Sequence, residues 1–218
     1  MATEDRFATD LILRLQSRPA RDLRAQFPRH AVVGIAIRGS EITKLEILFI
    51  QRATHAQDRW SGQIAFPGGH AEKNETDLQA LQREFSEELS TSVPQVPVAR
   101  LDDLQARKAG VDLALRVRPM LTLAPESTIQ PNLSEVAAAF YWPLQELLSD
   151  SRQTQHQVQY DSLARSFPAV DVGRGVPLWG LSYLIVEDLL TRLLQEKYLT
   201  NYGAFRPWRS TIENSQER

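Results

Sequence analysis

Residues 67–90 of the chain read PGGHAEKNETDLQALQREFSEELS, and this stretch predicts a tight turn followed by an amphipathic helix. The turn, residues 67–69, places two glycines just before the helix, where bare backbone can approach a ligand or offer a carbonyl oxygen to a metal ion. A helix over about residues 76–90 is predicted by apolar residues that recur at three- and four-residue steps, namely Leu78, Leu81, Phe85 and Leu89.

Three glutamates of this predicted helix, Glu84, Glu87 and Glu88, are spaced i, i+3 and i+4. Their carboxylates converge on one side, roughly 110° from the apolar stripe, so they border the core. A solvated acidic face is the commoner meaning of such a cluster. However, like charges at i, i+4 cost roughly 0.2–0.5 kcal/mol per pair. A hard divalent cation turns this repulsion into a net attraction, because it binds carboxylate oxygens. The three glutamates are therefore candidate metal ligands.

The same stretch resembles the Nudix box, G-x5-E-x7-R-E-U-x-E-E-x-G-U, in which U is a bulky aliphatic residue. Phe85 fills the first bulky position, and the fixed positions are matched by Gly69, Glu75, Arg83, Glu84, Glu87 and Glu88. Six such matches arise by chance with a probability on the order of 1 in 100,000. The resemblance implies a metal-dependent Nudix hydrolase with an α+β fold, a mixed β-sheet sandwiched between helices in a single domain.

The resemblance also implies a role for each matched residue. Mg²⁺ or Mn²⁺ would be bound by the carbonyl oxygen of Gly69 and by the carboxylates of Glu84, Glu87 and Glu88. A pair between Glu75 and Arg83 would hold the loop against the helix.

Two positions depart from the pattern: Ser90 stands where the box has Gly, and Thr91 stands where it has a bulky aliphatic residue. Glycine there would supply a left-handed residue that ends the helix. We expect Ser90 to cost about 1 kcal/mol or to move the helix end. Neither position supplies a carboxylate, so the departures predict altered helix termination and not lost catalysis.

The segment upstream of the box, residues 49–69, resembles the corresponding segment of coenzyme A diphosphatases. Arg52 with Ala53, and residues 62–69, match that pattern, whereas Trp60 stands where the subgroup has His. The resemblance implies cleavage of coenzyme A or acyl-CoA to 4′-phosphopantetheine and adenosine 3′,5′-bisphosphate. The candidate substrate-binding residues are Arg52, Arg59, Gly68 and Gly69.

Downstream, residues 132–144 resemble the Nudix strand that returns past the metal site, which makes Glu135 a candidate catalytic residue beside Glu84 and Glu87. Either Glu87 or Glu135 could act as the general base, and the sequence leaves that choice open. His55 and His70 have no metal-ligand spacing, so both are interpreted as loop histidines.

Three other functions compete with this one. Hydrolysis of ADP-ribose or another nucleoside diphosphate derivative uses the same chemistry and stays open. A catalytically silent Nudix-like module that binds nucleotides is disfavoured because all three box glutamates are kept. An isomerase acting on isopentenyl diphosphate needs a catalytic cysteine, and this sequence has none.

Composition restricts the setting. The length of 218 residues predicts a single domain. The net charge of −2 predicts no positive surface that would attract nucleic acid. The absence of cysteine, of a signal peptide and of a long apolar run favours a cytoplasmic protein with no membrane span. The expected partner is a small nucleoside diphosphate derivative. The sequence does not indicate the oligomeric state, and a homodimer is one option.

Periodicity predicts the order of the elements. We expect a helical extension at 1–29, a Nudix domain at 30–198 and a tail at 199–218. Helices are expected near 4–18, 76–90, 143–148 and 178–197. Strands are expected near 31–37, 42–50, 63–66, 96–104, 111–123 and 135–142, the first two forming a hairpin. Residues 150–178 are expected to be irregular apart from one strand near Val158.

Overall fold

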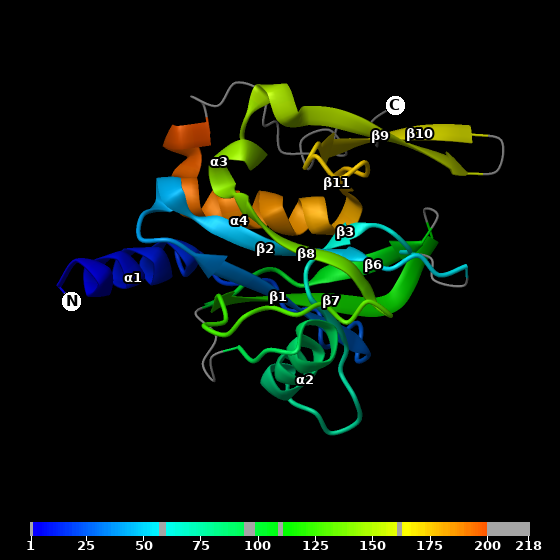
Figure 1. Ribbon diagram of the computed structural model, residues 1–218, viewed down its shortest axis with the longest axis horizontal. Coiled ribbons are helices and arrows are strands. Elements are labelled where there is room, and N and C mark those ends of the chain that lie inside the picture. Colours follow the sequence, from blue (N-terminus) through cyan, green and yellow to red (C-terminus); the bar gives the residue numbers. More distant parts are fainter. Residues whose placement is uncertain (1, 57–59, 94–98, 109–110, 161–162, 200–218) are drawn as a thin grey trace.

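The computed structural model describes residues 2–56, 60–93, 99–108, 111–160 and 163–199 (Figure 1). Its helices are α1 Ala2–Leu15, α2 Asp77–Leu89, α3 Leu144–Leu147 and α4 Gly180–Leu199, with 3-10 turns at Ile42–Lys44 and Asp150–Arg152. The strands of the main sheet are β1 His30–Arg38, β2 Glu46–Arg52, β3 Ile64–Ala65, β4 Gly68–His70, β5 Ala99–Arg100, β6 Leu104–Lys108, β7 Val111–Leu123 and β8 Val136–Pro143.

The main sheet is mixed and centres on β1. In the described residues, β1 runs parallel to β7 and antiparallel to both β2 and β4. On the outer sides, β8 and β3 pair with β2, while β5 and β6 pair with β7. Figure 1 shows α2 on one face of this sheet and α3 and α4 on the other. This arrangement confirms the expected α+β class, with the sheet between helices.

Both faces of β1 and β2 are buried, which explains their nearly continuous apolar sequences. Ile35, Ile37 and Phe49 belong to the core on the α4 side, together with residues of α1 and α3. Val32, Ala36, Leu48 and Ile50 belong to the core under α2, where they meet the helical stripe of Leu81, Phe85 and Leu89. The stripe predicted from the helical spacing is therefore the face that α2 buries.

Gly34 sets how closely α2 approaches the sheet. A Cβ atom at this position of β1 would lie 2.5 Å from Cε2 of Phe85 and 2.8 Å from Cδ1 of Leu81. Because no side chain stands there, the ring of Phe85 packs directly on the backbone of β1. This close packing fixes the distance between the sheet and the helix that carries the box glutamates.

Several expected elements need correction. The second strand of the expected hairpin begins at Glu46 and not at Ile42, because residues 42–44 form a 3-10 turn. The prediction that residues 150–178 are mostly irregular was wrong. They form a three-stranded antiparallel sheet of β9 Gln153–Tyr160, β10 Leu163–Val170 and β11 Leu178–Trp179. The one strand expected near Val158 is confirmed and lies within β9, whereas β10, whose run contains Pro168, was not expected.

The edges of other elements also differ from expectation. The strand expected at 96–104 is two short strands, β5 and β6, and residues 94–98 lie outside the described part. The last helix begins at Gly180 because Leu178 and Trp179 pair with β10. Trp179 packs against His156 and Phe167 of the second sheet. Of the expected tail at 199–218, all but Leu199 lies outside the described residues. In the described part of the chain, no helix is long and apolar enough to cross a membrane.

A buried ionic network attaches the N-terminal segment to α4. Asp102, only 4% exposed, accepts hydrogen bonds from Arg18 at 2.9 Å and from Arg192 of α4 at 2.8 Å. Arg192 also donates to the carbonyl oxygen of Leu15, and Arg18 pairs with Asp188. The network therefore ties the end of α1 and the residues after it to the loop before β6 and to α4.

The network predicts a loss of stability in acid. Burial by itself would raise the pKa of Asp102, but hydrogen bonds from Arg18 and from the Arg21 backbone N–H, with the charges of Arg18 and Arg192, lower it from 3.8 to about 2. Because the folded pKa is the lower one, the stabilisation is complete above pH 4 and is lost as the pH falls towards 2. Urea unfolding should show a loss of about 2 kcal/mol over that range.

Asp102→Asn, which cannot ionise, tests this assignment, with Asp10→Asn at an exposed ion pair as the matched control. The difference in unfolding free energy between wild type and Asp102→Asn should shrink between pH 5 and pH 2.5. A difference that stays constant with pH would contradict the role given to Asp102.

Candidate active site

The loop and the start of α2 are organised by local hydrogen bonds. Thr76 caps the helix: its side chain accepts from the N–H of Gln79, whose side chain in turn accepts from the N–H of Thr76. At the other end Ser90 adopts the left-handed conformation, with φ 51°, and its N–H closes the last turn. Of the two outcomes expected for Ser90, the structure has the strained one: serine takes the conformation that glycine usually supplies, and the helix ends at the expected place.

Arg83 of α2 links the loop before the helix to the acidic side chains of the helix. Its guanidinium donates to both oxygens of Glu75, at 3.0 and 3.1 Å, and to the carbonyl oxygen of His70 at 2.9 Å. The same group donates to Glu84 at 2.9 Å and to Glu87 at 3.0 Å. The structure thus contains the pair between Glu75 and Arg83 that the family resemblance implied, and it also brings two of the box glutamates onto the same arginine.

Glu88 is the most deeply placed of the three glutamates, with 2% of its surface exposed. Its carboxylate accepts a hydrogen bond from the backbone N–H of Gly68 at 2.9 Å. Burial raises the pKa of Glu88 to about 8, against that hydrogen bond and the charge of Arg52, and the charges of Glu84 and Glu135 add to the rise. Arg52 and Glu135, far from Glu88 in sequence, are therefore close enough to act on it.

Glu84 lies directly against Gly69. A Cβ atom at Gly69 would come within 2.7 Å of Cδ of Glu84, so only glycine leaves room for this carboxylate. Burial raises the pKa of Glu84, the interaction with Arg83 opposes the rise, and the charges of Glu87 and Glu135 support it. The glycine turn and the acidic helix, predicted separately from the sequence, meet at this contact.

The loop before β8 closes the other side of the cluster. The N–H of Asn132 donates to the carbonyl oxygen of Glu88 at 2.8 Å, and the N–H of Ala53 donates to the carbonyl oxygen of Glu135 at 2.8 Å. These backbone bonds anchor the loop to both α2 and the end of β2. The side chain of Glu135 is exposed, and Arg52 pairs with Val136 in the sheet.

The predicted site residues do not all come together. The buried Glu84 and Glu88 lie against the half-buried Gly69 and Gly68, with Arg52 and Glu135 near them. The side chain of Glu87 is 51% exposed and bound to Arg83. Arg59 lies outside the described residues. Of the two histidines interpreted as loop residues, His55 contacts the carbonyl oxygen of Ser134, and His70 ends β4.

The positions of the acidic side chains show how well they could hold the expected metal ion. Within the described residues, no group of three or more His, Asp or Glu side chains is positioned to hold one. Arg83 donates hydrogen bonds to both Glu84 and Glu87, so its positive charge neutralises these two carboxylates in place of a metal ion. The donor set still fits a hard divalent cation, because Glu84 and Glu88 are buried neighbours whose ionised forms are disfavoured without an added positive charge.

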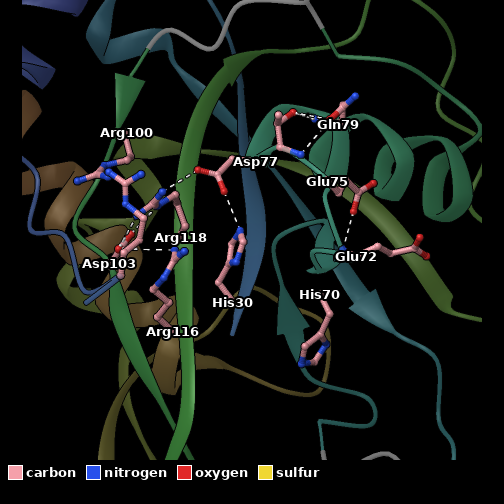
Figure 2. A network of polar contacts seen from close by, with 12 residues as sticks. His30, His70, Glu72, Glu75, Asp77, Gln79, Arg100, Asp103, Arg116 and Arg118 are labelled. Atoms are coloured by element: carbon pink, nitrogen blue, oxygen red, sulfur yellow. Dashed lines mark hydrogen bonds and ion pairs between the residues drawn. The ribbon is translucent and has the colours of Figure 1, made fainter. Parts of the chain in front are cut away.

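One network near the site was not predicted from the sequence (Figure 2). Asp77, the first residue of α2, accepts from Arg118 of β7 at 2.7 Å and contacts Nε2 of His30 of β1 at 2.7 Å. Arg118 is 3% exposed and also donates to both oxygens of the fully buried Asp103. The network clamps the start of α2 to two strands of the sheet. A signal was present in the sequence: Arg116 and Arg118 interrupt a long apolar strand two residues apart, on the same face.

Gly69→Ala tests the close contact between the turn and α2. The added Cβ would displace the carboxylate of Glu84, and a shift of about 1 Å at a catalytic group can cost about 100-fold in rate. We expect a loss of turnover of that order with the fold retained in circular dichroism. The matched control is Ala114→Val on the exposed side of β7. Unchanged turnover in Gly69→Ala would show that the position of Glu84 is not critical.

Comparison with known proteins identifies the family. The NUDIX domain model matches residues 28–165. An uncharacterised protein of Schizosaccharomyces pombe is 30% identical over 129 residues, which cover 56% of this chain but only 39% of that protein. Nudix hydrolase 3 of Caenorhabditis elegans is 25% identical over 171 residues, covering 70% of this chain and 68% of the relative.

Among solved structures, a MutT NUDIX hydrolase from Burkholderia pseudomallei is similar, with a TM-score of 0.44 and 20% sequence identity, over 54% of this chain and 84% of that one. The family model matches well over half of the 218 residues and includes the glycine turn, α2 and the loop before β8. The chain belongs to the NUDIX domain family.

Proposed function

We propose that this protein is a metal-dependent hydrolase that cleaves the diphosphate linkage of a nucleoside diphosphate derivative. The observation that carries the proposal is the contact of Gly69 with Glu84, beside the buried Glu88. Two buried carboxylates on one helix face, next to a glycine backbone, suit the binding of metal and phosphate together. Membership of the NUDIX family supports this chemistry.

Each residue has a role in the proposed mechanism. Glu84, Glu87, Glu88 and the carbonyl oxygen of Gly69 would hold Mg²⁺ or Mn²⁺, which when bound would neutralise the charge that develops on the diphosphate. Arg52 would bind a phosphate oxygen, which its electrostatic influence on Glu88 supports. Glu87 or Glu135 would orient the attacking water and accept its proton, and both are exposed enough to reach solvent.

Arg83 must release two of its partners when the metal binds. Its bonds to Glu75 and to the carbonyl oxygen of His70 can stay, since neither of these groups is a proposed ligand. Its bonds to Glu84 and Glu87 would be exchanged for the metal ion. Arg83 would then act as a positioning residue that keeps the loop against α2.

The proposed substrate is coenzyme A or an acyl derivative, cleaved to 4′-phosphopantetheine and adenosine 3′,5′-bisphosphate. Its support is the match of Arg52, Ala53 and residues 62–69 to the upstream segment of coenzyme A diphosphatases. A cytoplasmic location is part of the proposal and is supported by the absence of cysteine.

A substrate panel tests the assignment. The protein is incubated with Mn²⁺ and, separately, with coenzyme A, ADP-ribose, NADH and diadenosine polyphosphates, and the products are separated by chromatography. We expect the highest kcat/KM for coenzyme A and no turnover with EDTA. A preference for ADP-ribose would reject coenzyme A and keep the hydrolase. No turnover of any diphosphate with the metal present would favour a silent nucleotide-binding module.

Glu87→Gln tests the role of the acidic helix. Glutamine keeps the size of the side chain but neither accepts a proton nor binds the metal as an anion, so kcat should fall about 100-fold or more. Stability should change little, because the side chain of Glu87 is 51% exposed. Glu41→Gln, at an exposed ion pair with Lys44, is the matched control. If Glu87→Gln turned over at the wild-type rate, the metal-helix mechanism would have to be abandoned.

A further inference from the structure

A cavity of about 540 Å³ lies next to the loop between β4 and α2. It is bounded by the residues before β1 and by the loop itself, and we call it the Arg29 cavity. The residues that matter for its chemistry are Arg29, His30, His70, Glu72, Lys73 and Glu75. None of the three glutamates of α2, Glu84, Glu87 and Glu88, lines it. Two residues of its wall contact Arg83 of the acidic helix: the carboxylate of Glu75 and the carbonyl oxygen of His70 both accept hydrogen bonds from it.

Four groups that carry or can carry positive charge line the Arg29 cavity, namely Arg29, His30, His70 and Lys73. Burial, together with the charges of Arg29 and His30, lowers the pKa of His70. Within the described residues, the guanidinium of Arg29 and the ammonium of Lys73 make no hydrogen bond or ion pair. His30 is different, because its ring is held by Asp77 at 2.7 Å. Two cations on the cavity wall are therefore available to a ligand, with the ring of His70 near Arg29.

The acidic residues of the wall do not balance these cations. Both oxygens of Glu75 are engaged by Arg83, and one of them also accepts from the N–H of Glu72 at 2.8 Å. The carboxylate of Glu72 points away from both His30 and His70 in Figure 2. The cavity therefore presents donors and positive charge to its contents, which is the environment that selects a phosphate dianion.

We propose that the Arg29 cavity is a second binding site, outside the catalytic cluster, for a phosphate monoester that is held by Arg29 and Lys73 beside His70. Two ligands could supply the phosphate dianion: the phosphate monoester of a nucleotide and free inorganic phosphate. A monoester suits the site better than a diphosphate bridge, because its dianion concentrates two charges on one group, which matches the two cations that line the cavity.

Binding is measured by titration calorimetry in EDTA, so that neither metal nor turnover contributes. The probes are adenosine 3′,5′-bisphosphate and, separately, inorganic phosphate. The test variant is Arg29→Gln with Lys73→Gln. The matched control is Arg38→Gln with Lys44→Gln, which removes the same two charges from exposed ion pairs near the turn after β1.

We expect the dissociation constant of adenosine 3′,5′-bisphosphate to rise at least about tenfold in the test variant and to stay unchanged in the control. Tighter binding of the nucleotide than of phosphate would identify a nucleotide monoester as the ligand, and equal binding would identify free phosphate. Either result supports the site. Equal affinities in wild type and test variant, or no binding of either probe at millimolar concentration, would overturn it.

The proposal and the hydrolase assignment fail separately. The binding experiment contains no metal, so its outcome does not depend on catalysis. Hydrolysis of a diphosphate without a monoester, such as ADP-ribose, should in turn be unaffected in the test variant, because Arg29 and Lys73 do not contact the box glutamates.

Discussion

The close approach of α2 to the sheet is the constraint on which the rest of the site depends. It is set by two positions without side chains, Gly34 under Phe85 and Gly69 against Glu84, while Gly68 lets β4 lie close to the backbone of Val33 in β1. Where the backbones come this near, a carboxylate on the buried side of α2 reaches the main chain of β4 without intervening water. Glu88 then bonds to the N–H of Gly68 and becomes almost inaccessible. The close packing of α2 on the sheet therefore places the carboxylate of Glu88 in the protein interior and not at the surface.

Burying carboxylates is unfavourable unless positive charge accompanies them. Arg83 supplies part of that charge, since it bonds to Glu84 and Glu87 while Glu75 holds it in place. Among the described residues, the groups that favour the ionised form of Glu88 are the backbone N–H of Gly68 and the charge of Arg52, and burial outweighs them, so the pKa of Glu88 is raised. A cluster with this imbalance is suited to take up a divalent cation. The network of Asp77, Arg118 and His30 holds the first residue of α2, so ion pairs fix both the start and the middle of the helix.

Much of this could be predicted from the sequence because the decisive interactions are local. The helix was predicted from the spacing of Leu81, Phe85 and Leu89, and the glycine turn was predicted from residues 67–69. Of the second sheet, the strand near Val158 was predicted and lies in β9, but β10 and its pairing with β9 were missed, because pairing between strands leaves no pattern within one segment. The clamp on Asp77 was missed because its partners come from β1 and β7, and no local pattern links strands so far apart in sequence.

By itself, the sequence determined the class of fold, the position of the acidic helix and the resemblance to the NUDIX family, since these follow from periodicity and from a motif within one short segment. Only the tertiary structure decided which of the three glutamates are buried, what neutralises them, and which distant residues stand beside them. Burial and electrostatics depend on the summed surroundings of a group, and those surroundings are assembled from α2, the strands and the loop before β8. The turn and helix of residues 67–90 supply the groups of the site, and the packing of the sheet against them sets their charge.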